Sequence, residues 1–287
     1  MQNIKFFIGK GGVGKSTISA LSALCYSKNK IKTLLVSMDP AHNQQDIFDM
    51  EFSEKPVYLS ENLGIIETDI DFWIKKYLKE SEQKLQNNYN YHSAFSLKNY
   101  FKVLKFSPSV EEYAMLLSFL NVLKKHSEKD LIIFDMPPTA LSLRFFSLPG
   151  VSLKWIYHLK ELRIAIQNKK EIISKVKFGK REIEQDKVIN QLIKLENDYI
   201  EIFNYFKNSD INIVLNNENL SVKESKRIID KLSDIDLKIN SIFINKSDTK
   251  IDYFADIQQI TVPFSSKTLI GKNNLEEFLE QNNLINF

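Results

Sequence analysis

Gly9-Lys10-Gly11-Gly12-Val13-Gly14-Lys15-Ser16 fits the phosphate-binding pattern G-x-x-x-x-G-K-[ST] at every position. The apolar run Asn3–Ile8 before it predicts a strand, and Ser16–Lys28 after it predicts a helix. Glycines at such a turn let successive backbone N–H groups surround phosphate oxygens, and the start of the helix adds its dipole. The lysine of this pattern reaches the β- and γ-phosphates, and the hydroxyl after it is placed to bind Mg²⁺. The predicted nucleotide-binding residues are therefore Gly9, Lys10, Gly11, Gly12, Val13, Gly14, Lys15, Ser16 and Thr17.

Length and composition set the outer limits of the prediction. With 287 residues, 43% of them hydrophobic and 26% charged, the chain can bury a sizeable core. The 39 basic and 36 acidic residues give a net charge of +3, which does not indicate a nucleic-acid partner. Cys25, the single cysteine, excludes an intrachain disulfide framework and a cysteine-rich metal site. No apolar run approaches the ~20 residues of a membrane span and no signal-peptide pattern is visible, so we expect a cytoplasmic protein.

Short apolar runs separated by helical segments continue along the chain. Such runs alternate with helices in parallel sheets that are covered on both faces. Ser221 followed by Glu224 predicts a capping box at the start of a late helix. The pattern predicts an α/β fold with a doubly wound, mostly parallel sheet. The further predicted strands are Ile31–Ser37, Leu63–Thr68, Leu131–Phe134, Ile211–Leu215, Ser241–Asn245 and Ile260–Phe264.

Two longer stretches, about 71–126 and 151–208, interrupt this alternation. Both are helical by their periodicity; in the second, Trp155, Leu159 and Leu162 recur at steps of three and four residues. No glycine- or proline-rich linker separates them from the rest. We therefore expect a single domain over residues 1–287, with a helical subdomain formed by the two insertions.

Two aspartates follow predicted strands and complete a candidate site for phosphoryl transfer. Asp39 comes just after Ile31–Ser37, and Asp135 directly follows Leu131–Phe134. Ligands bind at the carboxyl ends of strands in open α/β sheets, so both carboxylates are expected near the phosphate loop. An aspartate there can orient an attacking water or hold Mg²⁺. We expect Asp39 and Lys15 to act in catalysis.

Lys10 distinguishes this loop from an ordinary phosphate loop. Lys10-Gly11-Gly12-Val13-Gly14-Lys15-Ser16-Thr17 resembles the deviant phosphate loop of the dimeric nucleotide-switch ATPases, the class that contains the partition, division-site and nitrogenase iron-protein ATPases. The resemblance implies a homodimer in which Lys10 crosses the interface, touches the partner's nucleotide and takes part in catalysis.

Further stretches resemble one family within that class. Ser37–Asp46, which contains Asp39-Pro40-Ala41-His42-Asn43, is similar to the first switch of the arsenite-pump ATPases and of the related tail-anchored-protein targeting ATPases. Asp135–Gly150 resembles the second switch of that family, and Pro108–Glu112 resembles a motif of its helical region.

The resemblance implies a role for individual residues. Asp39 would position the hydrolytic water, Ser16 would bind Mg²⁺ directly, and Asp135 would support the ion through water. Asn245 ends a predicted strand where the family places an adenine-reading asparagine, and Val262-Pro263-Phe264 resembles the strand that closes the base pocket. The implied ligands are ATP and Mg²⁺, with Asn245 and Pro263 at the base and Ser16, Asp39 and Asp135 at the metal.

The output of the implied switch stays open at this point. One interpretation is an ATPase that drives a membrane transporter, but the several thiolates of an arsenite site are absent. Another is a targeting chaperone that holds a hydrophobic client helix in a groove, although no Cys-x-x-Cys zinc site is present. A third is a GTPase of the same fold, because Asn245-Lys246-Ser247-Asp248 matches the guanine-reading N-K-x-D signature. The second switch also departs from the family's Pro-Thr-Gly-His, with Pro138-Thr139-Ala140-Leu141 in its place.

Overall fold

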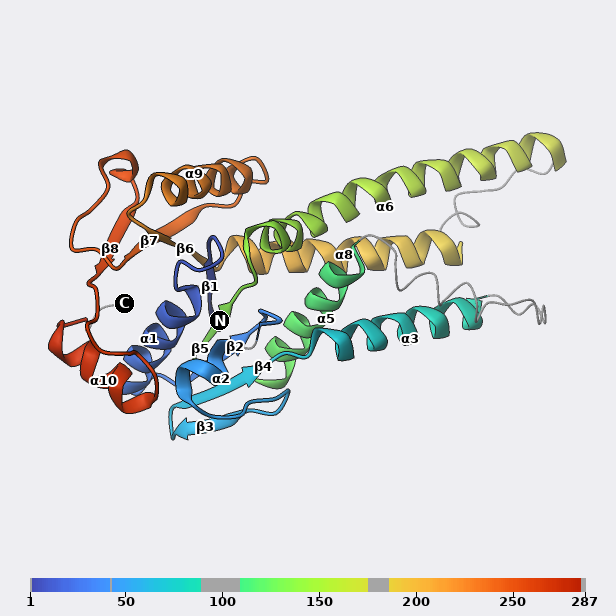
Figure 1. The fold of residues 1–287 in the computed structure, drawn as a ribbon. Helices are drawn as coiled ribbons and strands as arrows, with labels where there is room; N and C mark the ends of the chain where they lie inside the picture. The colour runs from blue at the N-terminus through green and yellow to red at the C-terminus, as the bar shows by residue number, and fades with distance from the viewer. Residues whose placement is uncertain (1, 42, 89–108, 175–185, 285–287) are drawn as a thin grey trace. The chain divides into compact units, whose positions relative to one another are not determined.

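Strands and helices alternate along the chain (Figure 1). The computed structural model describes residues 2–41, 43–88, 109–174 and 186–284. The strands are β1 (Asn3–Ile8), β2 (Thr33–Ser37), β3 (Val57–Ser60), β4 (Leu63–Glu67), β5 (Leu131–Asp135), β6 (Asp210–Asn216), β7 (Ile239–Asn245) and β8 (Gln258–Val262). The helices are α1 (Lys15–Lys28), α2 (Asn43–Phe48), α3 (Ile70–Asn88), α5 (Val110–Lys125), α6 (Thr139–Ser174), α8 (Lys187–Lys207), α9 (Asn219–Ser233), η1 (Asp252–Phe254) and α10 (Lys272–Gln281).

All the described strands join one sheet in the order β3-β4-β2-β5-β1-β6-β7-β8. Every neighbouring pair is parallel except β3 with β4. Strands β2, β4 and β5 are buried along their whole length, which explains their continuous apolar runs. The predicted α/β fold with a mostly parallel sheet is therefore confirmed.

The predicted strands are found in the structure, with two differences at the sheet edges. β8 begins and ends two residues before the predicted Ile260–Phe264, and Phe264 lies beyond it with 69% of its surface exposed. β3 was not predicted, because Val57–Ser60 is a four-residue antiparallel edge strand that is only partly buried. Edge strands of this kind carry little of the apolar signal that marks a buried strand.

Helices cover both faces of the sheet. On one face, α1 and α10 pack against residues such as Phe7, Leu35 and Phe243 in one apolar cluster. On the other face the rings of Phe6 and Phe134 stack 5.2 Å apart, and Phe119 of α5 lies 5.1 Å from Phe134. The alternation of Phe6 and Phe7 along β1 thus supplies both layers of the core.

The capping-box prediction at Ser221 is wrong. Helix α9 begins at Asn219, so Ser221 already lies in its first turn and cannot cap it. Its hydroxyl accepts a hydrogen bond from the Asn216 main-chain N–H at 3.1 Å instead. The carboxylate of Glu224 accepts one from the Thr139 hydroxyl at 2.9 Å, which joins α9 to the start of α6.

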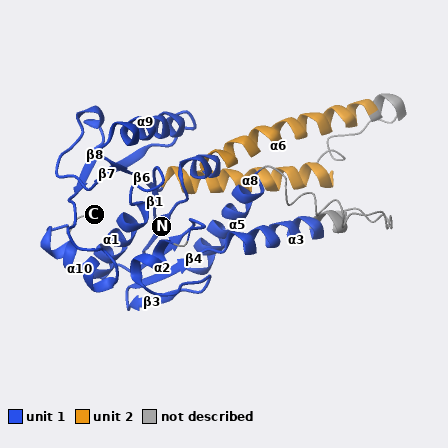
Figure 2. Ribbon diagram, in the orientation of Figure 1, with its two compact units in different colours: residues 1–145, 209–287 blue, residues 146–208 orange. Residues whose placement is uncertain are grey.

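The chain divides into two compact units (Figure 2). The sheet unit contains residues 1–145 and 209–287, and it includes α3, which packs on α5 with Tyr77 and Tyr113 stacked 5.4 Å apart. The second unit, residues 146–208, contains most of α6 together with α8. We call it the helical unit.

Within the helical unit, ring contacts and ion pairs join α6 to α8. Phe146 meets Phe206 edge to face, with 5.0 Å between ring centroids. Lys160 pairs with Glu196 at 2.7 Å, and Arg163 pairs with Asp186, the residue that caps α8, at 2.8 Å. No helix in the described ranges is both long and apolar enough to cross a membrane.

Candidate functional site

The phosphate loop forms the turn between β1 and α1, and two of its glycines are required by close contacts. A Cβ atom on Gly9 would lie 2.2 Å from the main-chain oxygen of Val214, and one on Gly14 would lie 2.2 Å from Asn245 Nδ2. Gly14 also has a φ of 89°, in the left-handed region that favours glycine. The two glycines let the loop lie directly against β6 and β7.

The other residues of the loop differ in exposure. Gly11 and Gly12 are exposed, whereas Val13 is buried and attaches the loop to the hydrophobic core. Lys15 is 5% exposed, and its ammonium donates to the main-chain oxygen of Lys10 at 3.4 Å. The ammonium of Lys10 itself is half-buried and pairs with no residue in the described ranges.

A carboxylate at the end of β5 lies directly beside the loop. Asp135 is fully buried, and Gln44 Nε2 donates to its Oδ2 at 2.9 Å. The same Gln44 nitrogen lies 3.1 Å from the main-chain oxygen of Ser16 and 3.1 Å from Ser19 Oγ. Gln44 thus joins α2, α1 and β5 through a single amide.

The surroundings of Asp135 disfavour its charge. Burial raises its pKa to about 6, hydrogen bonds from Ser16 and Gln44 and the charge of Lys15 oppose that rise, and the charge of Asp39 adds to it. The same interactions place Ser16, Lys15 and Asp39 in the surroundings of Asp135.

The cluster has the chemistry that Mg²⁺ requires. Asp135 Oδ1 is buried and accepts no hydrogen bond within the described residues. Nowhere in the described ranges do three or more His, Cys, Asp or Glu side chains gather as a metal cluster. Mg²⁺ usually takes one or two protein oxygens and completes its shell with phosphate and water. A carboxylate with a free oxygen beside a buried hydroxyl, that of Ser16, therefore fits this ion.

Asp39, just beyond β2, is buried to 6% exposure. Its Oδ1 accepts from the Ala41 N–H at 3.1 Å, and Asn43 Nδ2 lies 3.5 Å from its Oδ2. The main chain after it is tied to the sheet, because Gln45 donates to buried Glu67 through its main-chain N–H at 3.1 Å and its Nε2 at 2.6 Å. His42 of the predicted first switch lies outside the described residues.

A cavity of about 430 Å³ adjoins the phosphate loop on the side of β7 and β8. Asn245 lies in its wall, with Nδ2 donating to the main-chain oxygen of Val13 at 2.8 Å and Oδ1 accepting from the Lys246 N–H at 3.0 Å. Thr17 and Pro263 also line it. The predicted base-pocket residues and phosphate-loop residues thus share one cavity.

Asp248, the candidate guanine reader, is exposed and does not line this cavity. A guanine-binding aspartate must face the base to accept from its N–H groups. The geometry therefore does not support the N-K-x-D interpretation of Asn245–Asp248.

The second switch is held at two points beyond Asp135. The Thr139 hydroxyl bonds Glu224 of α9, and the Arg144 Nε lies 2.7 Å from Oε1 of Glu112, which is 2% exposed. Glu112 belongs to the predicted helical motif Pro108–Glu112, whose Pro108 lies outside the described residues. That motif and the second switch are therefore in direct contact through an ion pair.

Gln44 is the site residue that sequence reasoning missed. It stands in the quoted switch stretch beside Gln45 and Asp46, and nothing in the sequence distinguishes the three. Gln44 is fully buried, Gln45 is half-buried and Asp46 is exposed. Only the fold turns Gln44 toward Asp135.

Comparison with known proteins gives a consistent result. The model of the family described as anion-transporting ATPase matches residues 2–250. A Paramecium tetraurelia protein named ATPase ASNA1 homolog 2 is 28% identical, over 96% of this chain and 91% of its own length. An Aquifex aeolicus protein named putative arsenical pump-driving ATPase 2 is 26% identical, over 95% of this chain and 96% of its own. A Schizosaccharomyces japonicus protein named ATPase get3 is 31% identical, over 84% of this chain and 73% of its own.

Proposed function

The chain belongs to the anion-transporting ATPase family and is an ATPase, and we propose from this premise how its residues bind and hydrolyse ATP. The observation that carries the proposal is the convergence of Lys15, Ser16, Asp39 and Asp135 beside a 430 Å³ cavity at the carboxyl ends of the strands. That is the edge at which open α/β sheets bind nucleotides.

In this proposal the loop holds the phosphates and the cavity holds the base. The backbone N–H groups of Gly9–Ser16 surround the phosphate oxygens, and the buried ammonium of Lys15 faces the β- and γ-phosphates. Adenine enters between Thr17, Asn245 and Pro263. A calorimetric titration should show ATP bound more tightly than GTP, and the reverse order would contradict this assignment.

Ser16 and Asp135 would hold Mg²⁺, Ser16 through its hydroxyl and Asp135 through an intervening water. When bound, Mg²⁺ neutralises charge on the phosphates. Gln44 keeps Asp135 and the start of α1 at a fixed separation through its three bonds. Asp39, also near the ion, orients the attacking water with its carboxylate, whose orientation is fixed by the Ala41 N–H.

We also propose that the protein works as a homodimer in which Lys10 reaches the partner's nucleotide. The support is the half-buried ammonium of Lys10, which pairs with no described residue, whereas the ammonium of Lys15 bonds the loop itself. A cation delivered across an interface stabilises charge in the transition state only when the dimer is closed. Lys10→Ala should therefore retain ATP binding and lose turnover by about 10³-fold or more.

Mixing two inactive variants tests the dimer directly. If Asp39 and Lys10 of different subunits serve one site, each mixed dimer of Asp39→Asn with Lys10→Ala has one site with both substitutions and one with neither. Activity should then return on mixing, as measured by phosphate release. If subunits exchange, as shown by fluorescence energy transfer, and no activity returns, Lys10 does not act across the interface. Full activity of Lys10→Ala alone would contradict the proposal as well.

For the output of the switch we propose an apolar client segment. Ten of the seventeen large apolar residues exposed in the described ranges fall in the helical unit. Val151, Trp155, Leu162 and Ile166 lie at steps of four, seven and four residues, so they share one face of α6. An exposed apolar face of this extent indicates a binding surface for an apolar partner.

This surface favours a client over a metalloid. Cys25 is buried and is the one cysteine in the sequence, so a site made of several thiolates is not available in a single chain. Capture of a fluorescent apolar 20-residue helix in the presence of a non-hydrolysable ATP analogue tests the proposal. If no such helix is retained with or without the analogue, the proposal of an apolar client is contradicted. We propose the cytoplasm as the location, since a buried free thiol fits a reducing compartment.

A further inference from the structure

A second cavity lies at the opposite end of the strands that form the nucleotide site. It has a volume of about 300 Å³ and is bounded by β1, β6, β7, β8 and the later turns of α1. Lys5 at its rim lies on β1, four residues before Gly9 at the start of the phosphate loop, about 13 Å along an extended chain. The two cavities are therefore separate.

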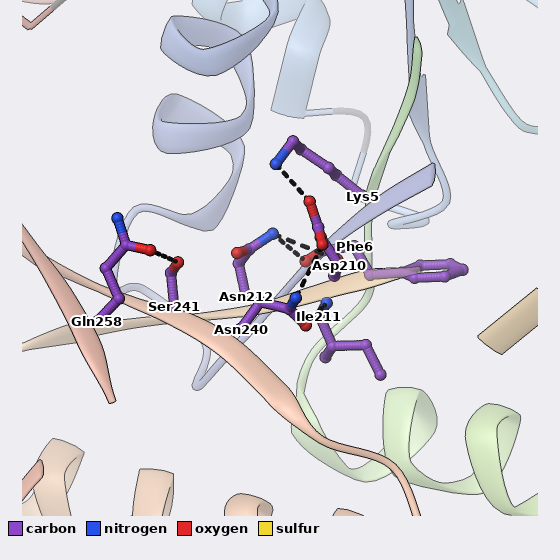
Figure 3. Close-up of polar contacts among 8 residues, drawn as sticks. All are labelled: Lys5, Phe6, Asp210, Ile211, Asn212, Asn240, Ser241 and Gln258. Atoms are coloured by element: carbon purple, nitrogen blue, oxygen red, sulfur yellow. Dashed lines mark hydrogen bonds and ion pairs between the residues drawn. The ribbon is translucent and has the colours of Figure 1, made fainter. Parts of the chain in front are cut away.

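A row of polar side chains crosses the floor of this cavity. In the sheet register Asn212 pairs with Ser241 and Ser241 pairs with Gln258, so the three lie side by side on neighbouring strands (Figure 3). Asn212 is 3% exposed and Ser241 is 8% exposed. A covered face of a parallel sheet is normally apolar, as it is in the next row at Val214, Phe243 and Ile260. Burying a carboxamide is unfavourable unless its polar atoms are bonded.

The bonds of Asn212 fix the orientation of its amide. Nδ2 donates to the main-chain oxygens of Phe6 and Asp210, both at 3.3 Å, so both of its hydrogens are used (Figure 3). Both partners are acceptors, and a flipped amide would therefore set oxygen against oxygen. Oδ1 is left as an acceptor without a donor among the described residues.

Two further groups are unused beside it. Gln258 accepts from Ser241 Oγ at 3.4 Å through Oε1, and its Nε2 donates to no residue in the ranges that the structure describes. Ser22 of α1 lines the cavity, is 1% exposed, and its hydroxyl has no partner within those ranges. The cavity thus offers an acceptor with a fixed direction, an amide donor and a hydroxyl.

Charge at the rim is neutralised internally. Lys5 Nζ lies 2.7 Å from Asp210 Oδ2, and Asn240 Nδ2 donates to Oδ1 of the same carboxylate at 2.8 Å (Figure 3). Burial lowers the pKa of Lys5, but Asp210 and Tyr26 outweigh it and raise that pKa overall, so the pair is ionic at neutral pH. An anion would have to compete with Asp210 for Lys5. The cavity therefore favours an uncharged ligand.

Aromatic and aliphatic side chains form part of the cavity wall, among a larger number of polar ones. Phe7 and Phe243 lie 5.3 Å apart at 60°, Ile260 is beside them, and Tyr26 stands on α1 with the Lys5 ammonium 5.4 Å from its ring. Small-molecule sites combine apolar surfaces with oriented polar groups, and 300 Å³ is at the small end of their range. A flat ring with one polar edge fits these surfaces.

We propose that this cavity binds an uncharged heterocycle that carries an amino group beside a ring nitrogen, as in the base of adenosine or cytidine. The amino group donates to Asn212 Oδ1 and the ring nitrogen accepts from Gln258 Nε2, so that two side chains together supply the acceptor and the donor that a single carboxamide presents to adenine. The phosphate-free form is selected because Asp210 already neutralises Lys5.

The test uses the full chain with its nucleotide site filled by a non-hydrolysable ATP analogue and Mg²⁺. Adenosine, cytidine, inosine and uridine are then titrated by calorimetry. Adenosine or cytidine should bind, and inosine or uridine should bind at least tenfold more weakly, because a keto oxygen would face Asn212 Oδ1. No binding of any nucleoside at millimolar concentration, or equal affinity for adenosine and inosine, would overturn the proposal.

Gln258→Leu removes the proposed amide donor. Gln258 is exposed on an edge strand, so its replacement does not disturb the core. This variant should bind adenosine or cytidine with about tenfold lower affinity, which is the effect of one lost hydrogen bond. Gln281→Leu, at an exposed glutamine of α10, is the matched control and should leave the affinity unchanged. Equal affinities of the two variants, with unchanged thermal unfolding, would refute the site.

Discussion

In the sheet unit Lys15, Asp39 and Asp135 are buried, whereas the helical unit leaves Trp155 and Leu162 65% and 57% exposed. Charged side chains are usually exposed and large apolar side chains are usually buried, so both arrangements are the opposite of the usual one. The buried carboxylates accept hydrogen bonds, such as those from Gln44 and Ala41, which offset part of the cost of their burial. The exposed apolar face of α6 is not covered by any described residue of its own unit. The buried charges of the sheet unit therefore suit chemistry on a ligand, and the exposed apolar face of the helical unit suits binding of a partner.

If the buried charges serve chemistry, Asp39→Asn should produce the largest effect. Asparagine keeps an oxygen for the Ala41 N–H, so the loop should keep its shape while the water loses its orienting carboxylate. We expect kcat to fall by about 10²- to 10⁴-fold with little change in ATP affinity. Turnover and equilibrium nucleotide binding, measured on one preparation, check this. Equal losses in both would make Asp39 a binding or folding residue.

The close packing of the phosphate loop against Asn245 predicts the next largest effect, a loss of stability. Gly14→Ala introduces a Cβ that would lie 2.2 Å from Asn245 Nδ2 at a φ of 89°. We expect the nucleotide-free protein to lose about 2–4 kcal/mol in its free energy of unfolding. Gly11→Ala is the matched control, since its Cβ would meet nothing within 4 Å, and it should stay within about 0.5 kcal/mol of the wild type. Denaturant unfolding of both variants measures the difference. Similar losses in the two would mean that Asn245 moves aside to make room for the new Cβ at Gly14.

Asp135→Asn should raise stability while it removes activity. The pKa of Asp135 is raised from 3.8 to about 6 by burial, so the folded protein holds this proton more tightly than the unfolded chain. Ionisation therefore destabilises the fold progressively from about pH 4 to pH 6 and fully above that. Removing the charge should add up to about 3 kcal/mol at pH 7.5 and almost nothing at pH 4.

Unfolding of the nucleotide-free protein at both pH values measures this difference. A variant that is less stable than the wild type at pH 7.5 would show that the carboxylate is better compensated than its burial suggests. A gain of the same size at both pH values would mean that its source is packing rather than charge.

The exposed face should give the smallest effect on stability. Trp155→Ser should change the free energy of unfolding by less than about 0.5 kcal/mol, yet weaken capture of an apolar helix by about tenfold or more. Ile156→Ser, one residue further and 4% exposed, should instead lose about 2–4 kcal/mol. Thermal unfolding and peptide anisotropy give the two readouts. A large loss of stability in Trp155→Ser would mean that this face is packed within the protein.

The sequence predicted the phosphate loop and the strands around it because backbone geometry there depends on residue type. A Cβ atom at Gly9 or Gly14 would lie 2.2 Å from a neighbouring strand residue, and a continuous apolar run such as Leu131–Phe134 is buried on both faces. Asp39 and Asp135 could be placed near the loop by topology alone, since parallel strands end at one edge of the sheet.

What the sequence could not supply depends on contacts between distant elements. Periodicity predicted the helix around Trp155 and Leu162, but it carries no information on whether an apolar face is covered. Gln44 reaches Asp135 across 91 positions, and its neighbours are equally polar. The polar row of Asn212, Ser241 and Gln258 exists only once the sheet register is known.

Asn245 belongs at once to the wall of the base cavity and to the support of the phosphate loop, through Val13 and through its contact with Gly14. A mutation that gave it a new base preference would also disturb the loop that grips the phosphates. Nucleotide selectivity in this protein is thus difficult to redesign at Asn245, and evolutionary drift toward another base would have to begin at lining residues that do not support the loop. Pro263 and Phe264, just beyond β8, are the positions at which a library should be randomised first.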